Sequence, residues 1–168
     1  MDIIRSEIKE FESYLGFPIE KKDILLESNE PHDETFSYTL CQRFYGKNDD
    51  LKKAIKIADR ILKKLLWEYK KDNSQVYLKD IETFYSLIGN MYYLLGDFKY
   101  AIGYFMKSLS YNKNDISNWV GLLFSLRSLG DFKLFEEGIF NFEKLCLAWR
   151  NDPEKEMTQK KVVGLIKK

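Results

Sequence analysis

Histidine, cysteine and proline are scarce in this sequence, and each scarcity excludes a kind of structure or site. One histidine, His32, and two widely separated cysteines, Cys41 and Cys146, cannot supply the closely spaced ligands that a zinc site needs. Only 3 prolines in 168 residues leave long uninterrupted stretches in which helices can form. No apolar run approaches the roughly 20 residues that a membrane-spanning helix needs.

Signals of enzymatic chemistry are equally poor. The glycines are not arranged as a phosphate-binding loop. The carboxylate pairs Asp49-Asp50 and Glu136-Glu137 fall where helix starts or solvated faces are expected, and not in a pattern for acid–base catalysis. We therefore expect a protein that is not an enzyme and that uses no cofactor and no metal. The charged N-terminus is unlike a signal peptide, and two free thiols suit a reducing compartment, so we expect a cytoplasmic protein.

Apolar residues recur at helical spacing along most of the chain, and no pair of strands is indicated. The longest such pattern runs from Leu51 to Leu66 and follows i, i+3, i+4, i+7 for about four turns. The sequence therefore predicts an all-α protein. The expected helices cover residues 2–15, 33–45, 50–71, 79–95, 98–112, 116–129, 132–149 and 153–166, with a short helix near 19–28.

One internal repeat organises this pattern. The pentapeptide Leu-Gly-Asp-Phe-Lys occurs at Leu95–Lys99 and again, 34 residues later, at Leu129–Lys133. An aromatic residue stands at the same offset before each copy, Tyr85 before the first and Trp119 before the second. Self-similarity at a fixed period is typical of repeat proteins in which helical hairpins stack.

In its period and its motif the sequence resembles the tetratricopeptide repeat family. Residues 82–115 match best: Gly89 and Ala101 are the small residues that let two helices approach, and Gly96 permits the left-handed backbone that ends the first helix. Residues 116–149 match less well, because Leu123 and Phe135 replace small residues, which predicts a splayed or shifted hairpin. The resemblance implies a short right-handed α-solenoid of about three hairpins with a capping helix at each end. The expected single domain, 1–168, divides into an N-terminal helical cap (1–32), a divergent repeat (33–73), the best repeat (82–115), the second repeat (116–149) and a C-terminal capping helix (153–168).

The resemblance also implies a binding surface, since members of the family commonly bind a peptide or a helix along the concave face. The cations of the family's carboxylate clamp are missing, which argues against recognition of a C-terminal carboxylate. Apolar residues on this face favour an amphipathic partner segment, although one of the chain's own terminal helices could fill the groove instead. The matching positions are Thr83, Ser86, Asn90, Tyr93, Ser117, Val120, Phe124 and Arg127.

A basic helix is the other candidate surface. Acidic residues prevail over 1–46 and basic residues over 47–71, although the net charge of the chain is only +1. The basic face consists of Lys52, Lys56, Arg60, Lys63 and Lys64. It is either a solvated outer face or a surface for nucleic acid, an anionic membrane or an acidic partner. We therefore expect a protein–protein interaction module, adaptor or chaperone-like, with a homo-oligomeric scaffold or a nucleic-acid-binding protein as alternatives.

Overall fold

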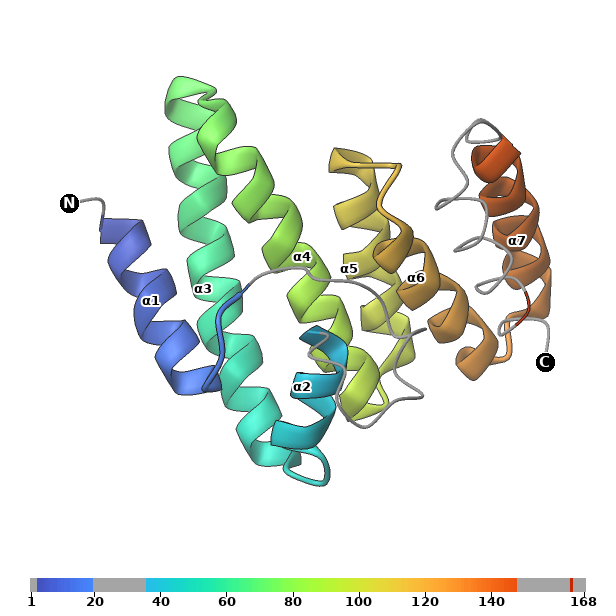
Figure 1. Cartoon of the computed structure of the whole chain (residues 1–168), viewed down its shortest axis with the longest axis horizontal. Helices are drawn as coiled ribbons and strands as arrows, with labels where there is room; N and C mark the ends of the chain where they lie inside the picture. The colour runs from blue at the N-terminus through green and yellow to red at the C-terminus, as the bar shows by residue number, and fades with distance from the viewer. Residues whose placement is uncertain (1–2, 20–35, 148–163, 165–168) are drawn as a thin grey trace.

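The computed structural model describes residues 3–19, 36–147 and 164, and within them the chain is helical with no strand (Figure 1). The all-α class predicted from the sequence is confirmed for this part of the chain. The short helix predicted near 19–28 and the capping helix predicted over 153–168 lie outside the described residues, apart from residues 19 and 164. The helices are α1 (Ile3–Leu15), α2 (Phe36–Phe44), α3 (Asn48–Asp72), α4 (Gln75–Leu95), α5 (Phe98–Tyr111), α6 (Ile116–Leu129) and α7 (Phe132–Leu147).

Glycine and aspartate mark most of the turns between these helices. Gly96 and Gly130 have φ angles of 84° and lie directly after α4 and α6, where the left-handed backbone lets the chain reverse. The Asp131 carboxylate accepts a hydrogen bond from the backbone N–H of Leu134 at 3.2 Å and so caps α7. Asp97 occupies the same position before α5, but its side chain makes no capping hydrogen bond.

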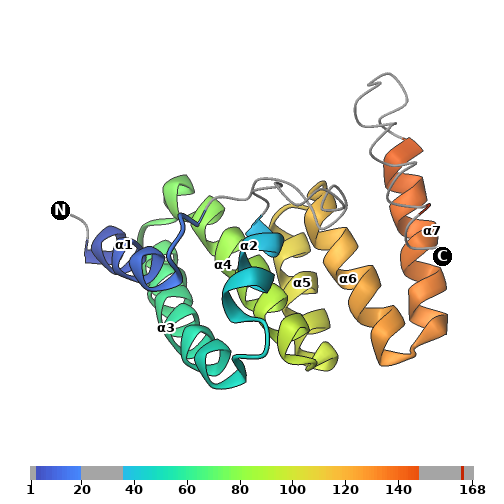
Figure 2. The same ribbon diagram turned by 60° about the horizontal axis from the view of Figure 1, so that its bottom comes forward.

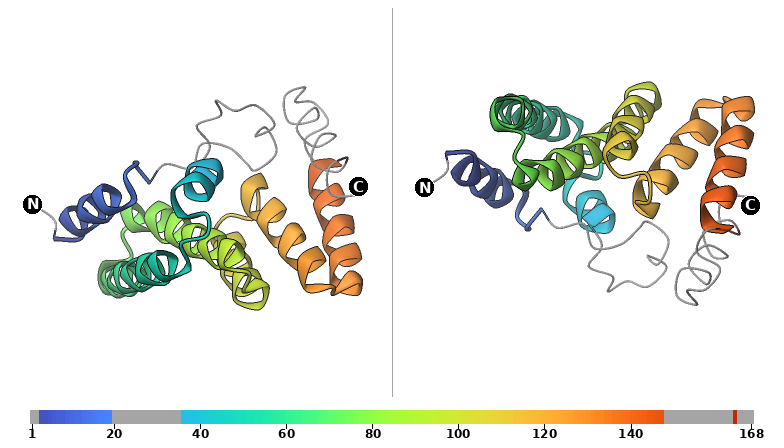
Figure 3. Two further views of the ribbon diagram at one scale, coloured as in Figure 1. Left: turned by 90° about the horizontal axis from the view of Figure 1, so that it is seen from below. Right: turned by 90° about the horizontal axis from the view of Figure 1, so that it is seen from above.

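Successive helices stand side by side in the row that Figure 1 shows from α3 to α7, each packed on the next. In the two views of Figure 3, α3 and α5 lie on one side of α4, and α2 lies on the other. Side chains of α3 and α5 line the walls of a groove on that side, and Tyr85 of α4 lies at its floor. Figure 2 shows that α6 and α7 diverge away from the turn that joins them.

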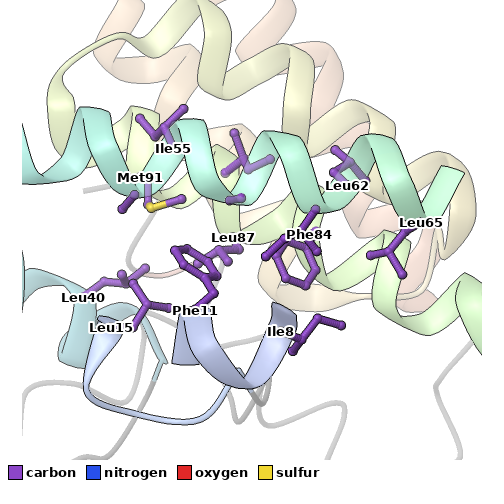
Figure 4. Packing of buried hydrophobic residues seen from close by; sticks show 14 of the residues in the cluster. Ile8, Phe11, Leu15, Leu40, Ile55, Leu62, Leu65, Phe84, Leu87 and Met91 are labelled. Carbon is purple, nitrogen blue, oxygen red and sulfur yellow. The ribbon is translucent and has the colours of Figure 1, made fainter. Parts of the chain in front are cut away.

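The main core lies where α1, α2, α3 and α4 meet. Phe11 of α1 is buried against Phe84 of α4, with ring centroids 6.1 Å apart, and Leu15 and Leu40 close the same layer (Figure 4). Two ion pairs fix α1 at its edges. Arg5 Nη1 lies 2.9 Å from Asp80 Oδ2 on α4, and Lys64 on α3 pairs with Glu7.

A second core joins α4, α5 and α6 around one ring. Phe105 of α5 is buried, and its Cδ1 atom would be 3.1 Å from a Cβ at Gly89 of α4. The other edge of the ring faces Gly121 of α6, where a Cβ would overlap ring atoms. Three helices can therefore pack closely because two of them present no side chain to this aromatic residue.

Candidate functional site

Two of the eight positions predicted for the concave binding surface are buried. Ser86 is 2% exposed and Val120 is fully buried. Val120 packs with Leu123, Phe142 and Cys146 between α6 and α7. Residues with so little exposed surface cannot form a contact surface for a partner, so the assignment of Ser86 and Val120 to a binding surface is wrong.

Three polar positions of the predicted surface bond within their own helix or its cap. Thr83 Oγ1 donates to the carbonyl of Lys79 at 2.8 Å, and Asn90 Nδ2 donates to the carbonyl of Ser86 at 3.0 Å. Ser117 Oγ donates to Asp115 Oδ1 at 2.6 Å. The side-chain donors of these three residues are thus already used inside the protein, whereas recognition of a peptide backbone would need them for the partner.

The three remaining positions are half-buried and lie at the C-terminal ends of α4 and α6. Tyr93 packs against Phe98 with ring centroids 5.4 Å apart, and the guanidinium of Arg127 lies 4.8 Å from the centre of the Phe124 ring. Because these three side chains are partly exposed, binding on the concave face stays a prediction. The buried Val120 does not join them into one continuous apolar surface.

On the side of α4 away from the predicted concave surface, a groove has the features of a binding site. It has a volume of about 730 Å³, with α3 and α5 as its walls. Its lining combines apolar and aromatic side chains with lysines near the opening. The lining residues are Asp59, Leu62, Lys63 and Leu66 of α3, Tyr85 of α4, and Lys99, Tyr100, Gly103, Tyr104 and Lys107 of α5.

Five tyrosines of α4 and α5 form a continuous ladder, and three of them, Tyr85, Tyr100 and Tyr104, line the groove. Their ring centroids lie 5.8 Å apart for Tyr111 and Tyr85, 6.2 Å for Tyr85 and Tyr104, 5.4 Å for Tyr104 and Tyr92, and 5.2 Å for Tyr92 and Tyr100. The ring at each end is exposed, Tyr111 to 39% and Tyr100 to 59%, so the ladder reaches the solvent at both ends.

Sequence reasoning missed this ladder, although each helix carries a signal of it. Tyr85 and Tyr92 are seven residues apart on α4, and Tyr100, Tyr104 and Tyr111 follow at intervals of four and seven on α5. Such intervals place each set on one face of its helix. Only the packing of α4 against α5 shows that the two faces meet.

The electrostatics of the groove centre on one carboxylate. Asp59 Oδ2 lies 2.8 Å from Lys63 Nζ, one helical turn away on α3, and this hydrogen-bonded pair raises the pKa of Lys63. Burial is the main cause that raises the pKa of the Tyr104 hydroxyl to about 12, and the nearby charge of Asp59 adds to it. Burial is also the main cause that raises the pKa values of Tyr85 and Tyr92, with smaller effects of Tyr111 and Asp59 on Tyr85 and of Asp59 and Asp97 on Tyr92.

The predicted basic face adjoins the groove along α3. Lys52, Lys56, Arg60, Lys63 and Lys64 are all exposed there. A shallower hollow of about 480 Å³ is lined by four of these cations, Asp59 and the exposed Trp67. Two of the cations are paired with carboxylates, Lys63 with Asp59 and Lys64 with Glu7, which weakens the positive field of this face.

No protein-family model matches the chain, and no curated protein matches it either. In the part of the chain that the structure describes, no cluster of three or more His, Cys, Asp or Glu side chains could hold a metal ion. None of the described helices is both long enough and apolar enough to cross a bilayer. By its fold and its groove, the protein is an all-helical protein with a tyrosine-lined groove between α3 and α5.

Proposed function

We propose that this protein is a non-enzymatic interaction module that holds a segment of a partner protein in the groove between α3 and α5. The observation that carries the proposal is the lining of that groove. Leu66, Tyr85 and Tyr104 offer partly exposed apolar surface in an open hollow, whereas the interior of an isolated helical protein normally closes over such residues. Tyrosine also suits protein interfaces, because its ring is apolar and its hydroxyl can bond to a partner.

The proposal includes a short right-handed solenoid of tetratricopeptide-like hairpins as the scaffold. The 34-residue spacing between Leu95–Lys99 and Leu129–Lys133 supports it, and so does the close packing of α4 on α5 through Gly89 and Phe105. Each hairpin of such a scaffold leaves surface on two sides of its first helix, so a partner can be bound on either face. An adaptor or a chaperone-like protein of the cytoplasm would use its surface in this way.

Gly103 gives a direct test of the groove. It lies in the middle of α5, it lines the groove, and a Cβ there would meet no atom within 4 Å. Gly103→Trp therefore fills the groove without disturbing the core. Met106→Trp is the matched control, because Met106 is 57% exposed on the same helix but does not line the groove.

The experiment is affinity capture from the native host with both variants and the unchanged protein, followed by mass spectrometry. We expect the unchanged protein and Met106→Trp to capture the same protein, and Gly103→Trp to lose it while its circular dichroism stays the same. Tyr93→Ala combined with Phe124→Ala tests the concave face in parallel. Loss of the partner with this double variant, and not with Gly103→Trp, would move the binding site to the concave face.

A further inference from the structure

We infer that the groove between α3 and α5 recognises an acidic amphipathic segment, with aliphatic side chains on the groove floor and carboxylates directed to Lys99 and Lys107. This inference rests on the proposed function and adds the chemistry of the partner to it. Three features of the groove carry it: the distribution of charge, the shape of the floor and the orientation of the tyrosine rings.

The charge of the groove is uneven between its two walls. On the α3 wall, Asp59 and Lys63 lie 2.8 Å apart and neutralise each other. On the α5 wall, Lys99 and Lys107 are exposed, and the sequence of α5 contains no acidic residue. A partner carboxylate is therefore attracted more strongly to the α5 wall than to the neutralised pair on the α3 wall, and this difference also favours one orientation of the bound segment.

The spacing of the two lysines specifies the spacing of the partner's carboxylates. Lys99 and Lys107 are eight residues apart, which is about 12 Å along the axis of α5 at the α-helical rise. Carboxylates about two turns apart on one edge of a partner helix match this distance. The exposed cations Lys56 and Arg60 extend the positive surface beyond the groove toward the far side of α3.

The floor between the walls offers places for aliphatic side chains. Tyr85 of α4 lies there, and the partly exposed Leu66 lies beside it on the α3 wall. Gly103 on the α5 wall leaves open space where a side chain would be. A partner side chain such as leucine can enter this notch and contact carbon atoms on both walls. The combination of an apolar floor with a cationic wall is that of grooves that bind amphipathic helices.

The orientation of the tyrosines favours a protein over a single-stranded nucleic acid. Base stacking needs an open ring face, but the rings of Tyr85, Tyr92 and Tyr104 each lie against two neighbouring rings of the ladder. The two terminal rings, Tyr100 and Tyr111, are 59% and 39% exposed, and only Tyr100 of these lines the groove. The groove thus offers rings that already contact one another, together with aliphatic carbon, which suit the side chains of a protein segment.

The test uses two synthetic fluorescent peptides and the full chain. The first is an amphipathic helix with leucines on one face and glutamates two turns apart along its edge, and the second has glutamine in place of each glutamate. We expect fluorescence anisotropy to show about fivefold tighter binding of the glutamate peptide at low salt, as two exposed ion pairs give. Lys99→Gln with Lys107→Gln should abolish this preference, and Lys52→Gln with Lys70→Gln, which removes the same charge from α3, should leave it unchanged.

Each other result has a definite meaning. Equal affinity for both peptides, lost in Gly103→Trp, would overturn the acidic partner and keep the groove as a protein-binding site. Binding of the glutamate peptide that is unchanged in Gly103→Trp would overturn the groove itself. Failure of both peptides to bind, or their displacement by an oligothymidylate, would overturn the inference, and the capture experiment with Gly103→Trp would still decide the proposed function separately.

Discussion

The aromatic ring of Phe105 on α5 lies directly against the backbone of Gly121 on α6, so that a Cβ at Gly121 would be 2.9 Å from Cε2 and closer still to two other ring atoms. Gly89 of α4 lies against the same ring, less tightly. The single ring thus sets how closely three helices approach. Since α4 and α5 also form the floor and one wall of the groove, this contact positions the candidate site.

Gly121→Ala should destabilise the protein by about 2 kcal/mol, because a buried ring must shift to make room for the added methyl group. Gly89→Ala should cost less, since its Cβ would stand 3.1 Å or more from the ring. Gly103→Ala is the control and should be neutral or stabilising by up to about 0.8 kcal/mol, as expected for a helical glycine in open space. Urea unfolding followed by circular dichroism measures all three.

A compensating substitution separates overpacking from other causes. Phe105→Leu removes the ring atoms that overlap the new methyl group, so it should recover part of the stability that Gly121→Ala loses. If Phe105→Leu and Gly121→Ala are simply additive in their free energies of unfolding, the ring contact is not the cause of the loss.

The sequence predicts the helices well where local signals are strong. Leu51 and the apolar residues after it define α3, and Gly96 and Gly130 define the ends of α4 and α6. It misses the first turn of α4, which begins at Gln75 and not at residue 79, because that turn is held by tertiary contacts. Tyr77 packs on the main core there.

The candidate site is predicted less well than the helices for a physical reason. A family resemblance assigns residues to a face by their position in the repeat, whereas burial depends on how neighbouring helices rotate and cross. Ser86 and Val120 are therefore buried against expectation. The tyrosine ladder depends in the same way on the packing of α4 against α5, which neither helix specifies alone.

The buried hydrogen bonds between Asn118, Ser108 and Glu82 give a second prediction. Asn118 Nδ2 donates to Ser108 Oγ at 2.6 Å, and Ser108 Oγ donates to the backbone carbonyl of Glu82 at 2.9 Å, so the bonds join α6, α5 and α4. Ser108→Ala should cost about 1–3 kcal/mol, because it leaves the buried Asn118 amide without this acceptor.

A double-mutant cycle checks that the two side chains act through each other. Asn118→Leu combined with Ser108→Ala should destabilise clearly less than the sum of the single substitutions, since no buried polar group is then left without its partner. Thermal unfolding of the four proteins measures the coupling. A coupling near zero would show that the Asn118–Ser108 hydrogen bond contributes nothing.

The tyrosine ladder gives a prediction about alkaline pH. The pKa of Tyr104 is raised from 10.0 to about 12 in the folded protein, mainly by burial, so the unfolded chain loses this proton at lower pH than the folded one. The stabilisation of the folded state that this pKa difference provides is fully present below pH 10 and is lost as the pH rises toward 12. The free energy of unfolding must therefore fall over that interval.

Tyr104→Phe isolates this contribution from the lysines that titrate in the same range. The variant should lose less stability than the unchanged protein between pH 10 and 12, as measured by urea unfolding. Tyr45→Phe, at a position 88% exposed, should behave as the unchanged protein does. A phenolate absorbance titration in which all eleven tyrosines ionise together near pH 10 would contradict the raised pKa values.

The two cysteines should differ in reactivity although both are free thiols. Cys146 is 3% exposed and packs against Val120 and Phe142, and burial, with a smaller effect of Glu143, raises the pKa of its thiol from 9.0 to about 11. At neutral pH its thiolate fraction is therefore about a hundredfold below that of an ordinary thiol. Cys41 is only half-buried, and burial raises its pKa as well.

Iodoacetamide should thus alkylate Cys41 first in the folded protein and both residues at similar rates in urea, as followed by peptide mass spectrometry. Equal rates in the folded protein would show that α6 and α7 open often enough to expose Cys146, and the packing between them would then be weaker than the structure indicates.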